Sequence, residues 1–366
     1  MKTLLKTLIL SIVLVFIVGI SRAFANPIPT SAPVVLQGMC DASAILKINS
    51  QFLVLNDEDQ ETTFFRLFDF SKGGKPISAP VLPREKLQID SKNPEIDFEG
   101  LAQVGDVYFA LASHSRNKNF KPRDSRKNLV AFRWKSEVEN PIEVLASLQN
   151  LVPALQAKLK STEGVGISEI DRAKDPKQDD GDGGLSIEGI SAMPNGNLLI
   201  GLRSPTNPSM NSEAPRQAIA VELVNPLLSV TSNNVTLGNV HLWQFNGAGI
   251  RDLDYDGTHR QIIILSGPPG AGDTFKIWTW DGNAISQPTE IQDLTSYKSI
   301  SQILAEGVVP EGITIDNDHL WVVFDEGKRK IAGAECKSLT TADQQKTFRA
   351  VSTPYNFKAI ASDGRE

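Results

Sequence analysis

Apolar residues along this chain come in short runs that are bounded by glycine, asparagine or aspartate. Runs of this kind, rich in β-branched and aromatic side chains, are typical of β-strands joined by turns. The pattern first appears over residues 41–68, where three apolar runs are separated by the turn Asn49-Ser50 and by a polar stretch. It recurs along the rest of the chain with little helical periodicity. The sequence therefore predicts an all-β protein.

Each group of runs begins with an acidic residue that a small or apolar residue follows. The acidic residues are Asp41, Glu99, Glu188, Asp252 and Glu311. Successive acids lie 58, 89, 64 and 59 residues apart. A unit of about sixty residues with three or four short strands is typical of a propeller blade. The spacing predicts a five-bladed β-propeller; the alternatives are a sixth blade within residues 136–184 and an irregular β-sandwich.

The strands of the five predicted units follow from the apolar runs. The first strands are predicted at residues 41–46, 99–104, 188–193, 252–255 and 311–315. The second and third strands are predicted at residues 52–55 and 64–68, 107–111 and 129–134, 198–202 and 218–223, 262–265 and 275–280, and 320–324 and 348–351. The longest gap, residues 135–187, separates the second unit from the third, and we expect it to hold an insertion.

That insertion contains the one segment with clear helical periodicity. Its apolar residues at helical spacing are Leu148, Leu151, Val152, Leu155 and Leu159. We expect a short amphipathic helix around residues 147–160, lying over the ring. The polar residues 171–184 are expected to form a surface loop.

The N-terminal residues have a different character. Two lysines precede an apolar run of 13 residues, Leu8–Ile20, and Ala23-Phe24-Ala25 supplies small residues for cleavage. This predicts a signal peptide over residues 1–25 and a single propeller domain over residues 26–366. An uncleaved anchor is the alternative, but the run is short of the roughly 20 residues that span a bilayer. We expect an exported bacterial protein, periplasmic or extracellular, without a stable membrane anchor.

The charge balance narrows the range of partners. The net charge is −6, and residues 1–25 contain three basic and no acidic residues, so the predicted mature chain carries −9. A negative protein without a basic block is poorly suited to bind a phosphate backbone, which argues against nucleic acid. We expect a monomer whose ligand is a small molecule or an anion.

The chain has two cysteines, Cys40 and Cys336, near opposite ends of the predicted mature protein. In a closed ring the first and last blades are neighbours, so a disulfide between these residues would join them. Disulfides persist outside the cytoplasm, where we expect the protein to reside. The alternative is a pair of buried free thiols.

Several short motifs resemble an uncharacterised bacterial family that is catalogued as a domain of unknown function. They are Cys40-Asp41-Ala42-Ser43, Asn56-Asp57-Glu58-Asp59, Ser113-His114-Ser115-Arg116-Asn117-Lys118, Gly183-Gly184-Leu185-Ser186-Ile187-Glu188-Gly189 and Gly249-Ile250-Arg251-Asp252-Leu253. These motifs are similar to those of the broader phytase-like and esterase-like propellers. The resemblance covers nearly the whole mature chain and implies a propeller without an assigned substrate.

The first strand of each propeller blade lines the central channel, so the five repeated acids are expected to form a ring of carboxylates. Like charges in such a ring need raised pKa values, basic partners such as Arg251 or Arg203, or a bound cation. Ca²⁺ suits several oxygen ligands in a flexible ring, so Asp41, Glu99, Glu188, Asp252 and Glu311 are candidate calcium ligands. The alternative is that these acids cap strands and bond backbone groups of the next blade.

A second layer of polar residues follows the second strands and includes Asp57, His114, Arg203 and Asp325. We expect these side chains to share one pocket with the ring of acids, because each second strand runs antiparallel to its first. Acid–base chemistry or binding of an anion would suit this set, with His114, Glu188 and Arg203 as candidate catalytic residues. Arg251, on the opposite side of its strand from Asp252, is expected to tie blades together.

Two glycine-rich segments suggest ion or phosphate binding but depart from the known loops. Asp179–Gly184 has glycines where a calcium loop has ligands, and Gly267–Thr274 has Asp273 where a phosphate loop has lysine. We interpret the first as a flexible acidic loop and the second as a hairpin connection. Two functions remain: a metal-assisted hydrolase of phosphoester or ester substrates, and a non-enzymatic ligand-binding or scaffolding propeller.

Overall fold

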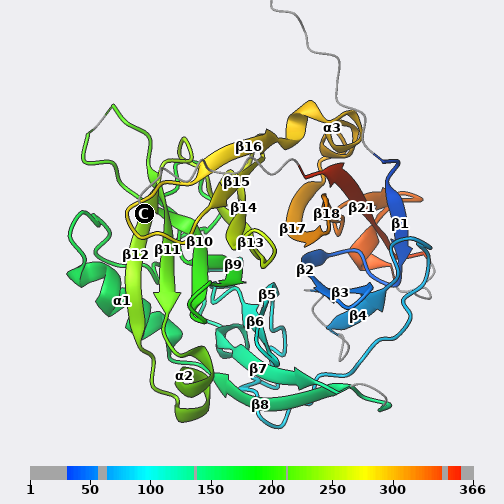
Figure 1. Cartoon of the computed structure of the whole chain (residues 1–366), viewed down its shortest axis with the longest axis horizontal. Helices are drawn as coiled ribbons and strands as arrows, with labels where there is room; N and C mark the ends of the chain where they lie inside the picture. The colour runs from blue at the N-terminus through cyan, green and yellow to red at the C-terminus, as the bar shows by residue number, and fades with distance from the viewer. Residues whose placement is uncertain (1–30, 57–63, 136–137, 212, 340–344, 356–366) are drawn as a thin grey trace, which may run out of the picture.

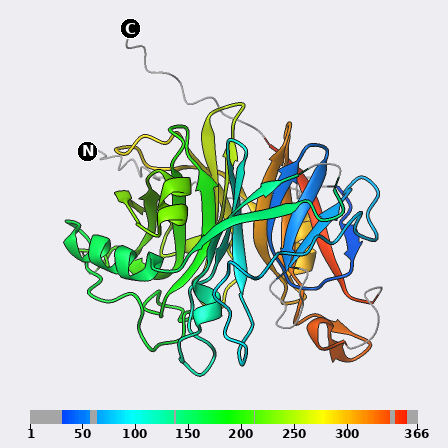
Figure 2. The ribbon, with the colours of Figure 1, turned by 90° about the horizontal axis from the view of Figure 1, so that it is seen from below.

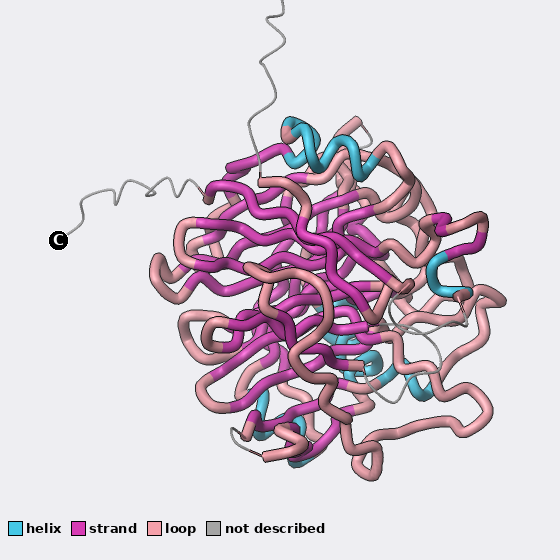
Figure 3. Tube along the Cα trace, turned by 90° about the vertical axis from the view of Figure 1, so that its right-hand side faces the viewer, coloured by secondary structure: helices cyan, strands magenta, loops and turns pink. Residues whose placement is uncertain are grey.

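The computed structural model describes residues 31–56, 64–135, 138–211, 213–339 and 345–355. Within these residues, five β-sheets of three or four strands stand around a central axis (Figure 1). Strands are the main regular structure of the body, and the helical segments are short (Figure 3). The predicted five-bladed propeller is confirmed, and the alternatives of six blades and a sandwich are wrong. The predicted signal peptide lies outside the described residues.

Four blades are built from consecutive antiparallel strands. The first has β2 (Ala42–Ile48), β3 (Gln51–Asn56) and β4 (Phe65–Phe68). The second has β5 (Phe98–Val104), β6 (Val107–Ala112), β7 (Leu129–Trp134) and β8 (Ile142–Leu148). The third has β9 (Ser186–Ala192), β10 (Leu198–Asn207), β11 (Gln217–Leu223) and β12 (Leu237–Trp243). The fourth has β13 (Gly249–Asp256), β14 (Gln261–Gly267), β15 (Lys276–Trp280) and β16 (Thr289–Asp293).

The fifth blade combines both ends of the chain. Its strands are β17 (Val309–Asp316), β18 (His319–Asp325), β21 (Thr347–Pro354) and β1 (Val34–Gln37). The outermost strand, β1, pairs antiparallel with β21, so a segment from the start of the chain completes the last sheet. A small hairpin of β19 (Lys330–Ile331) and β20 (Ala334–Glu335) lies between β18 and β21 in the sequence and projects from one side of the ring (Figure 2).

The inner strands β2, β5, β9, β13 and β17 each pack against the inner strands of the two neighbouring blades. Apolar side chains from adjacent sheets fill the space between blades, which is why the strands carry so many branched and aromatic residues. Phe65, Phe98 and Phe132 pack together between the first two blades. The ring centroids of Trp243 and Trp280 lie 5.1 Å apart between the third and fourth blades. The core is thus distributed between the blades and leaves the axis for polar residues.

The helices lie at the edge of the ring. They are α1 (Leu151–Ser161), α2 (Pro226–Ser232) and α3 (Lys298–Leu304), with single turns η1 (Asp124–Lys127), η2 (Leu294–Ser296) and η3 (Cys336–Ser338). The predicted insertion helix is present, but it lies beside the outer strand β12 instead of over the ring (Figure 1). There its apolar face packs against apolar side chains of the outer strands of the third blade. Among the described residues, no helix is long and apolar enough to cross a membrane.

A disulfide bond joins Cys40 and Cys336, with their Cα atoms 5.9 Å apart. Cys40 immediately precedes the first blade, and Cys336 begins η3 after the hairpin of the fifth blade. The backbone N–H of Glu326 also donates to the carbonyl of Cys40 at 2.9 Å. The predicted disulfide is therefore confirmed, and it closes the ring at the same seam as β1.

Reduction of this disulfide should destabilise the protein markedly. The bond spans 296 residues of sequence, so the chain-entropy account gives a contribution on the order of 5 kcal/mol. We expect the urea midpoint of the wild type to fall in reductant, as unfolding followed by tryptophan fluorescence would show. The double variant Cys40→Ser/Cys336→Ser should unfold at the midpoint of the reduced wild type and be insensitive to reductant. Equal midpoints with and without reductant would contradict a stabilising role.

Candidate functional site

Every inner strand contains a β-bulge near its start. Relative to the second strand of its blade, each inner strand carries one extra residue, at Ser43, Glu99, Glu188, Arg251 and Glu311. A bulge bends the strand and redirects a side chain, and bulges are frequent next to functional sites. These five residues are therefore structurally equivalent positions, one in each blade.

The residue after each bulge lies close to a neighbouring strand. A Cβ on Gly189 would come within 2.8 Å of Leu253 Cγ in the fourth blade, and one on Gly100 within 2.7 Å of Ile190 Cγ2 in the third. The adjoining blades leave no room for a side chain at these points. This explains why the pair Glu-Gly recurs in three of the five blades.

The repeated acids therefore do not occupy equivalent positions in all five blades. In the first blade Ser43 stands at the bulge and Asp41 two residues earlier, and in the fourth Arg251 stands there and Asp252 one residue later. Successive side chains of a strand point to opposite faces, so Asp252 leaves the axis. Its Oδ2 accepts a hydrogen bond from the N–H of Ile313 at 2.7 Å, which ties the fourth blade to the fifth. Burial raises the pKa of Asp252 well above its usual range.

Arg251 forms ion pairs with two of the other repeated carboxylates. Its Nη1 lies 2.9 Å from Glu188 Oε2 in the third blade and 3.0 Å from Glu311 Oε1 in the fifth. Arg203, from β10, donates through Nη1 to Glu188 Oε1 at 2.7 Å and through Nε to the carbonyl of Pro269 at 2.8 Å. Arg251 thus connects the blades, as predicted, but it does so from the axis, where Asp252 was expected, and Asp252 points away.

The two carboxylates that share Arg251 differ in acidity. Burial opposes ionisation of Glu188, but the positive charges of Arg203 and Arg251 outweigh it and lower its pKa. Burial raises the pKa of Glu311 to about 7, because Arg251 offsets the loss of water only in part and the charge of Glu188 adds to the rise. One buried carboxylate therefore stays ionised while its neighbour titrates near neutral pH, an arrangement found at acid–base sites.

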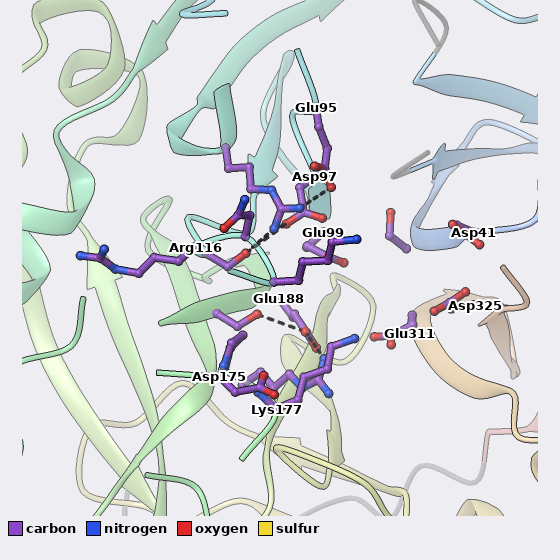
Figure 4. A pocket seen from close by; sticks show the side chains of 18 of the residues that line it. Asp41, Glu95, Asp97, Glu99, Arg116, Asp175, Lys177, Glu188, Glu311 and Asp325 are labelled. Carbon is purple, nitrogen blue, oxygen red and sulfur yellow. Dashed lines mark hydrogen bonds and ion pairs between the residues drawn. The ribbon is translucent and has the colours of Figure 1, made fainter. Parts of the chain in front are cut away.

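These residues form the floor of a cavity of about 440 Å³ at one mouth of the channel (Figure 4). The predicted residues that line it are Asp41, Glu99, Glu188, Arg203, Glu311 and Asp325. Cavities of this size take small-molecule ligands. The structure thus brings together most of the predicted ring and mouth residues, and Asp252 does not line this cavity.

His114 lies outside the cavity lining. Its side chain is buried, and Nδ1 lies 2.7 Å from the carbonyl oxygen of Ala112. Burial lowers the pKa of His114 to about 4, so the ring is neutral at physiological pH. This histidine is placed to shape the chain after β6 instead of to exchange protons with a ligand. Asp57, the other mouth residue expected here, lies outside the described residues.

Sequence reasoning did not single out one polar cluster on the cavity wall. Asp97, just before β5, accepts from Ser115 Oγ at 3.2 Å and lies 2.8 Å from Arg126 Nη1. Arg126 also pairs with Glu95, and all four residues line the cavity. The one signal for this cluster was the polar stretch Ser113–Lys118 after the second strand of its blade.

Basic residues from three loops complete the wall. Lys118 follows β6, Lys177 precedes β9 and Lys328 follows β18. The segment that contains Lys177 was interpreted as a surface loop, yet Asp175, Pro176 and Lys177 all line the cavity (Figure 4). Lys118 ends the motif Ser113–Lys118, but no repeat or motif marked Lys177 or Lys328, because each of these loops is particular to its blade.

Three of the five proposed calcium ligands are already engaged in this arrangement. Glu188 and Glu311 contact Arg251, and Asp252 bonds backbone N–H groups. Across the part of the chain that the structure describes, no three His, Cys, Asp or Glu side chains are grouped closely enough to hold a metal ion. The donor set therefore does not fit Ca²⁺ as it stands, and the calcium site stays a prediction.

The fold and the cavity define a class of protein: a five-bladed propeller with a charged pocket on its axis. Residues 177–343, which span the third and fourth blades and the two inner strands of the fifth, match the family described as "Protein of unknown function (DUF3616)". This match confirms the resemblance to a domain of unknown function over these residues, which include the motifs Gly183–Gly189 and Gly249–Leu253; the three motifs at residues 40–43, 56–59 and 113–118 lie outside it. No curated protein matches the sequence.

Solved structures with similar architecture share little sequence with this chain. A luciferin-regenerating enzyme is 9% identical, over 88% of this chain and 95% of that chain, with a TM-score of 0.37. A GH43 β-1,3-galactosidase with galactodeoxynojirimycin is 9% identical, over 87% and 91%, with a TM-score of 0.47. A chain described as the extracellular domain of a hybrid two-component system from B. thetaiotaomicron is 10% identical, over 77% of this chain and 31% of that one, with a TM-score of 0.31. This chain thus spans about a third of the last protein, and at these values no activity carries over.

Replacing Arg251 should destabilise the whole ring. Arg251→Met removes the shared partner of two buried carboxylates, and breaking a buried ion pair from one side costs about 3–5 kcal/mol. Urea unfolding would measure this loss. The control is Arg133→Met, which removes the exposed pair to Asp106 and should cost about 1 kcal/mol or less. Similar losses in the two variants would show that Arg251 is not a structural tie.

Glu311 should make stability depend on pH in a definite direction. Its pKa of about 7 exceeds its usual value of 4.5, so between these values the folded protein holds a proton that the unfolded chain releases. The free energy of unfolding that Glu311 contributes is therefore fully present below pH 4.5 and is lost as the pH rises through 7. Unfolding of Glu311→Gln, measured from pH 4 to 8, should show a smaller decline than the wild type over this window. A parallel decline in both proteins would contradict the raised pKa.

Proposed function

We propose that the cavity on the axis is a hydrolytic site for phosphoester or ester substrates, with Glu311 as the acid–base residue. The observation that carries this proposal is the pair of carboxylates on Arg251, of which Glu188 stays ionised and Glu311 titrates near neutral pH. A group with a pKa near the working pH can both donate and accept a proton efficiently. Glu311 also lines the cavity, where a substrate can reach it.

The chain supplies a distinct role for each residue of this group. Glu311, when protonated, would donate to the leaving oxygen of the substrate and, when ionised, would accept a proton from the attacking water. Glu188 keeps Arg203 and Arg251 oriented through its two oxygens. Arg203 would hold the developing negative charge, and its Nε bond to Pro269 fixes its direction before substrate binds. This division of roles explains why one carboxylate is kept ionised beside another that titrates.

A metal-assisted reaction is the other form of this proposal. A bound Ca²⁺ would polarise the substrate, but it would have to compete with Arg251 for the oxygens of Glu188 and Glu311. The acid–base form needs no such exchange of partners, and for that reason we prefer it.

Binding without catalysis is the second candidate function. The observation in its favour is that Glu188, Arg203, Arg251 and Glu311 satisfy one another's charges, as purely structural networks do. In that case the cavity would hold a polar ligand and Glu311 would only help to bind it.

We also propose that the protein works outside the cytoplasm, in the periplasm or extracellular space, as a monomer. Two observations support export: the signal-peptide pattern of residues 1–25 and the disulfide, a bond that persists in oxidising compartments.

A panel of chromogenic substrates tests the hydrolytic proposal. We expect turnover of 4-nitrophenyl phosphate, bis(4-nitrophenyl) phosphate or 4-nitrophenyl acetate by the wild type, and a loss of about 100-fold or more in kcat for Glu311→Gln. The control is Glu222→Gln, a buried carboxylate that bonds His241 on the outer strands of the third blade and should leave kcat unchanged.

Each outcome of this panel separates the alternatives. Activity that falls in EDTA and returns with Ca²⁺ would favour the metal-assisted form. Binding of these compounds without turnover, with and without Ca²⁺, would favour the binding protein. Equal losses in Glu311→Gln and Glu222→Gln would remove Glu311 from the acid–base role.

A further inference from the structure

A second cavity adjoins the one on the axis. It also has a volume of about 440 Å³, and it lies towards the fourth and fifth blades, where Arg251, Ala271, Leu304 and Val309 line it. Five residues line both cavities: Lys177, Arg203, Glu311, Asp325 and Lys328. We call the cavity on the axis the first chamber, the adjoining one the second chamber, and these five residues the neck.

The neck is held in place by close contacts between two loops. Oδ1 of Asp179 accepts a hydrogen bond from the N–H of Ala271 at 2.8 Å. A Cβ on Gly270 would lie 2.0 Å from that same oxygen and 2.4 Å from the carbonyl of Lys177, so this approach requires glycine. The backbone that carries Lys177 is therefore fixed against the loop between β14 and β15. Both glycine-rich segments of the sequence meet here, which explains their composition.

The charge of the neck favours an anion. It contains Lys177, Lys328 and Arg203, against the carboxyls of Glu311 and Asp325. Arg203 also pairs with Glu188 in the wall of the first chamber, so the two lysines are the cations that none of these carboxylates holds in an ion pair. Of these carboxyls, Glu311 is partly protonated at neutral pH because burial raises its pKa to about 7. Ammonium and guanidinium groups are the usual protein ligands of phosphate oxygens.

The two chambers differ in character on either side of this neck. The first chamber is walled almost entirely by polar and charged residues of both signs, among them Asn117, Arg126 and Glu95. The second chamber is also lined by charged residues such as Asp273 and Arg329, but one side of it is apolar, formed by Leu304, Val308 and Val309. A ligand that occupies both chambers would thus have two unlike arms joined at an anionic centre.

We propose that the substrate of this site is a phosphodiester, with its phosphate at the neck and one organic arm in each chamber. The inference rests on the proposed hydrolytic function and narrows its substrate class. A phosphomonoester has a single arm and would leave one chamber empty. A carboxylic ester has no charge at its centre and would not use the cations of the neck.

The reaction is a simple hydrolysis at phosphorus. The oxygen of water forms a bond to phosphorus, and the bond between phosphorus and one ester oxygen breaks. Protonated Glu311 gives its proton to the departing oxygen, which leaves as an alcohol, and Glu311 is reprotonated by the attacking water. The products are one alcohol and one phosphomonoester, so atoms and charge balance without a further reactant.

Binding to the catalytically impaired Glu311→Gln variant tests the substrate class separately from turnover. By calorimetry, bis(4-nitrophenyl) phosphate should bind about tenfold tighter than 4-nitrophenyl phosphate. Lys177→Gln, placed in the same background, should weaken binding of the diester by about tenfold, because it removes one charged contact to phosphate. The matched control is Lys330→Gln, an exposed lysine of the hairpin that does not line either chamber and should have no effect.

A second variant tests the two-armed arrangement itself. Ala271→Phe places a ring in the second chamber and keeps the backbone N–H that bonds Asp179. It should weaken the diester by about tenfold and leave the affinity for the monoester unchanged. Equal losses for both compounds, or equal affinities of the two compounds for the parent protein, would overturn the proposal.

The failure of this inference differs from the failure of the proposed function. If the wild type cleaves the monoester or the acetate at least as well as the diester, the hydrolase stands and the diester specificity is wrong. If nothing is cleaved but the diester is bound with the stated dependence on Lys177 and Ala271, the hydrolytic function is wrong and the two-chambered site for a diester stands.

Discussion

Charge balance at the centre of the ring is the constraint on which the rest of this structure depends. Bulges in the inner strands carry ionisable residues in four of the five blades: Glu99, Glu188, Arg251 and Glu311. Buried charges are tolerated only when they are paired. A single guanidinium from the fourth blade meets carboxylates of the third and fifth, so the electrostatic solution also fixes how three blades sit beside one another.

The same balance separates the two carboxylates chemically. Glu188 has two cationic partners and Glu311 has one, and that difference decides which of them ionises first. The acidity of the carboxylates in the cavity is therefore set by the way the blades pack in the ring. A propeller can change that chemistry through one residue at a bulge, which illustrates how one fold accommodates many functions.

The fold could be predicted almost completely from the sequence. The apolar runs and the recurring Glu-Gly pairs can be read along the chain without knowledge of tertiary contacts. The prediction was wrong where the site depends on which single residue of the inner strand forms the bulge. Asp41 and Asp252 matched the acidic pattern, but the bulge falls at Ser43 and Arg251, and a bulge cannot be located without the strand that pairs with it. The helix of residues 151–161 was predictable from its apolar face, whereas its position against β12 depended on tertiary packing. The neck was out of reach, since Lys177 and Lys328 come from unrelated loops that only the closed ring brings together.

The pairing of β1 with β21 has a consequence for the order of folding. Residues 34–37 pair with residues 347–350, so the last sheet cannot be completed until nearly the whole chain has been synthesised. Contacts between such distant segments carry a large loop-closure entropy and form slowly. Four blades can assemble progressively as the chain emerges, while the first strand remains unpaired. The inner strands β17 and β2 can meet before that point, so a chain truncated before β21 would keep the contact between the first and fifth blades but would leave β1 without its partner and the fifth sheet incomplete.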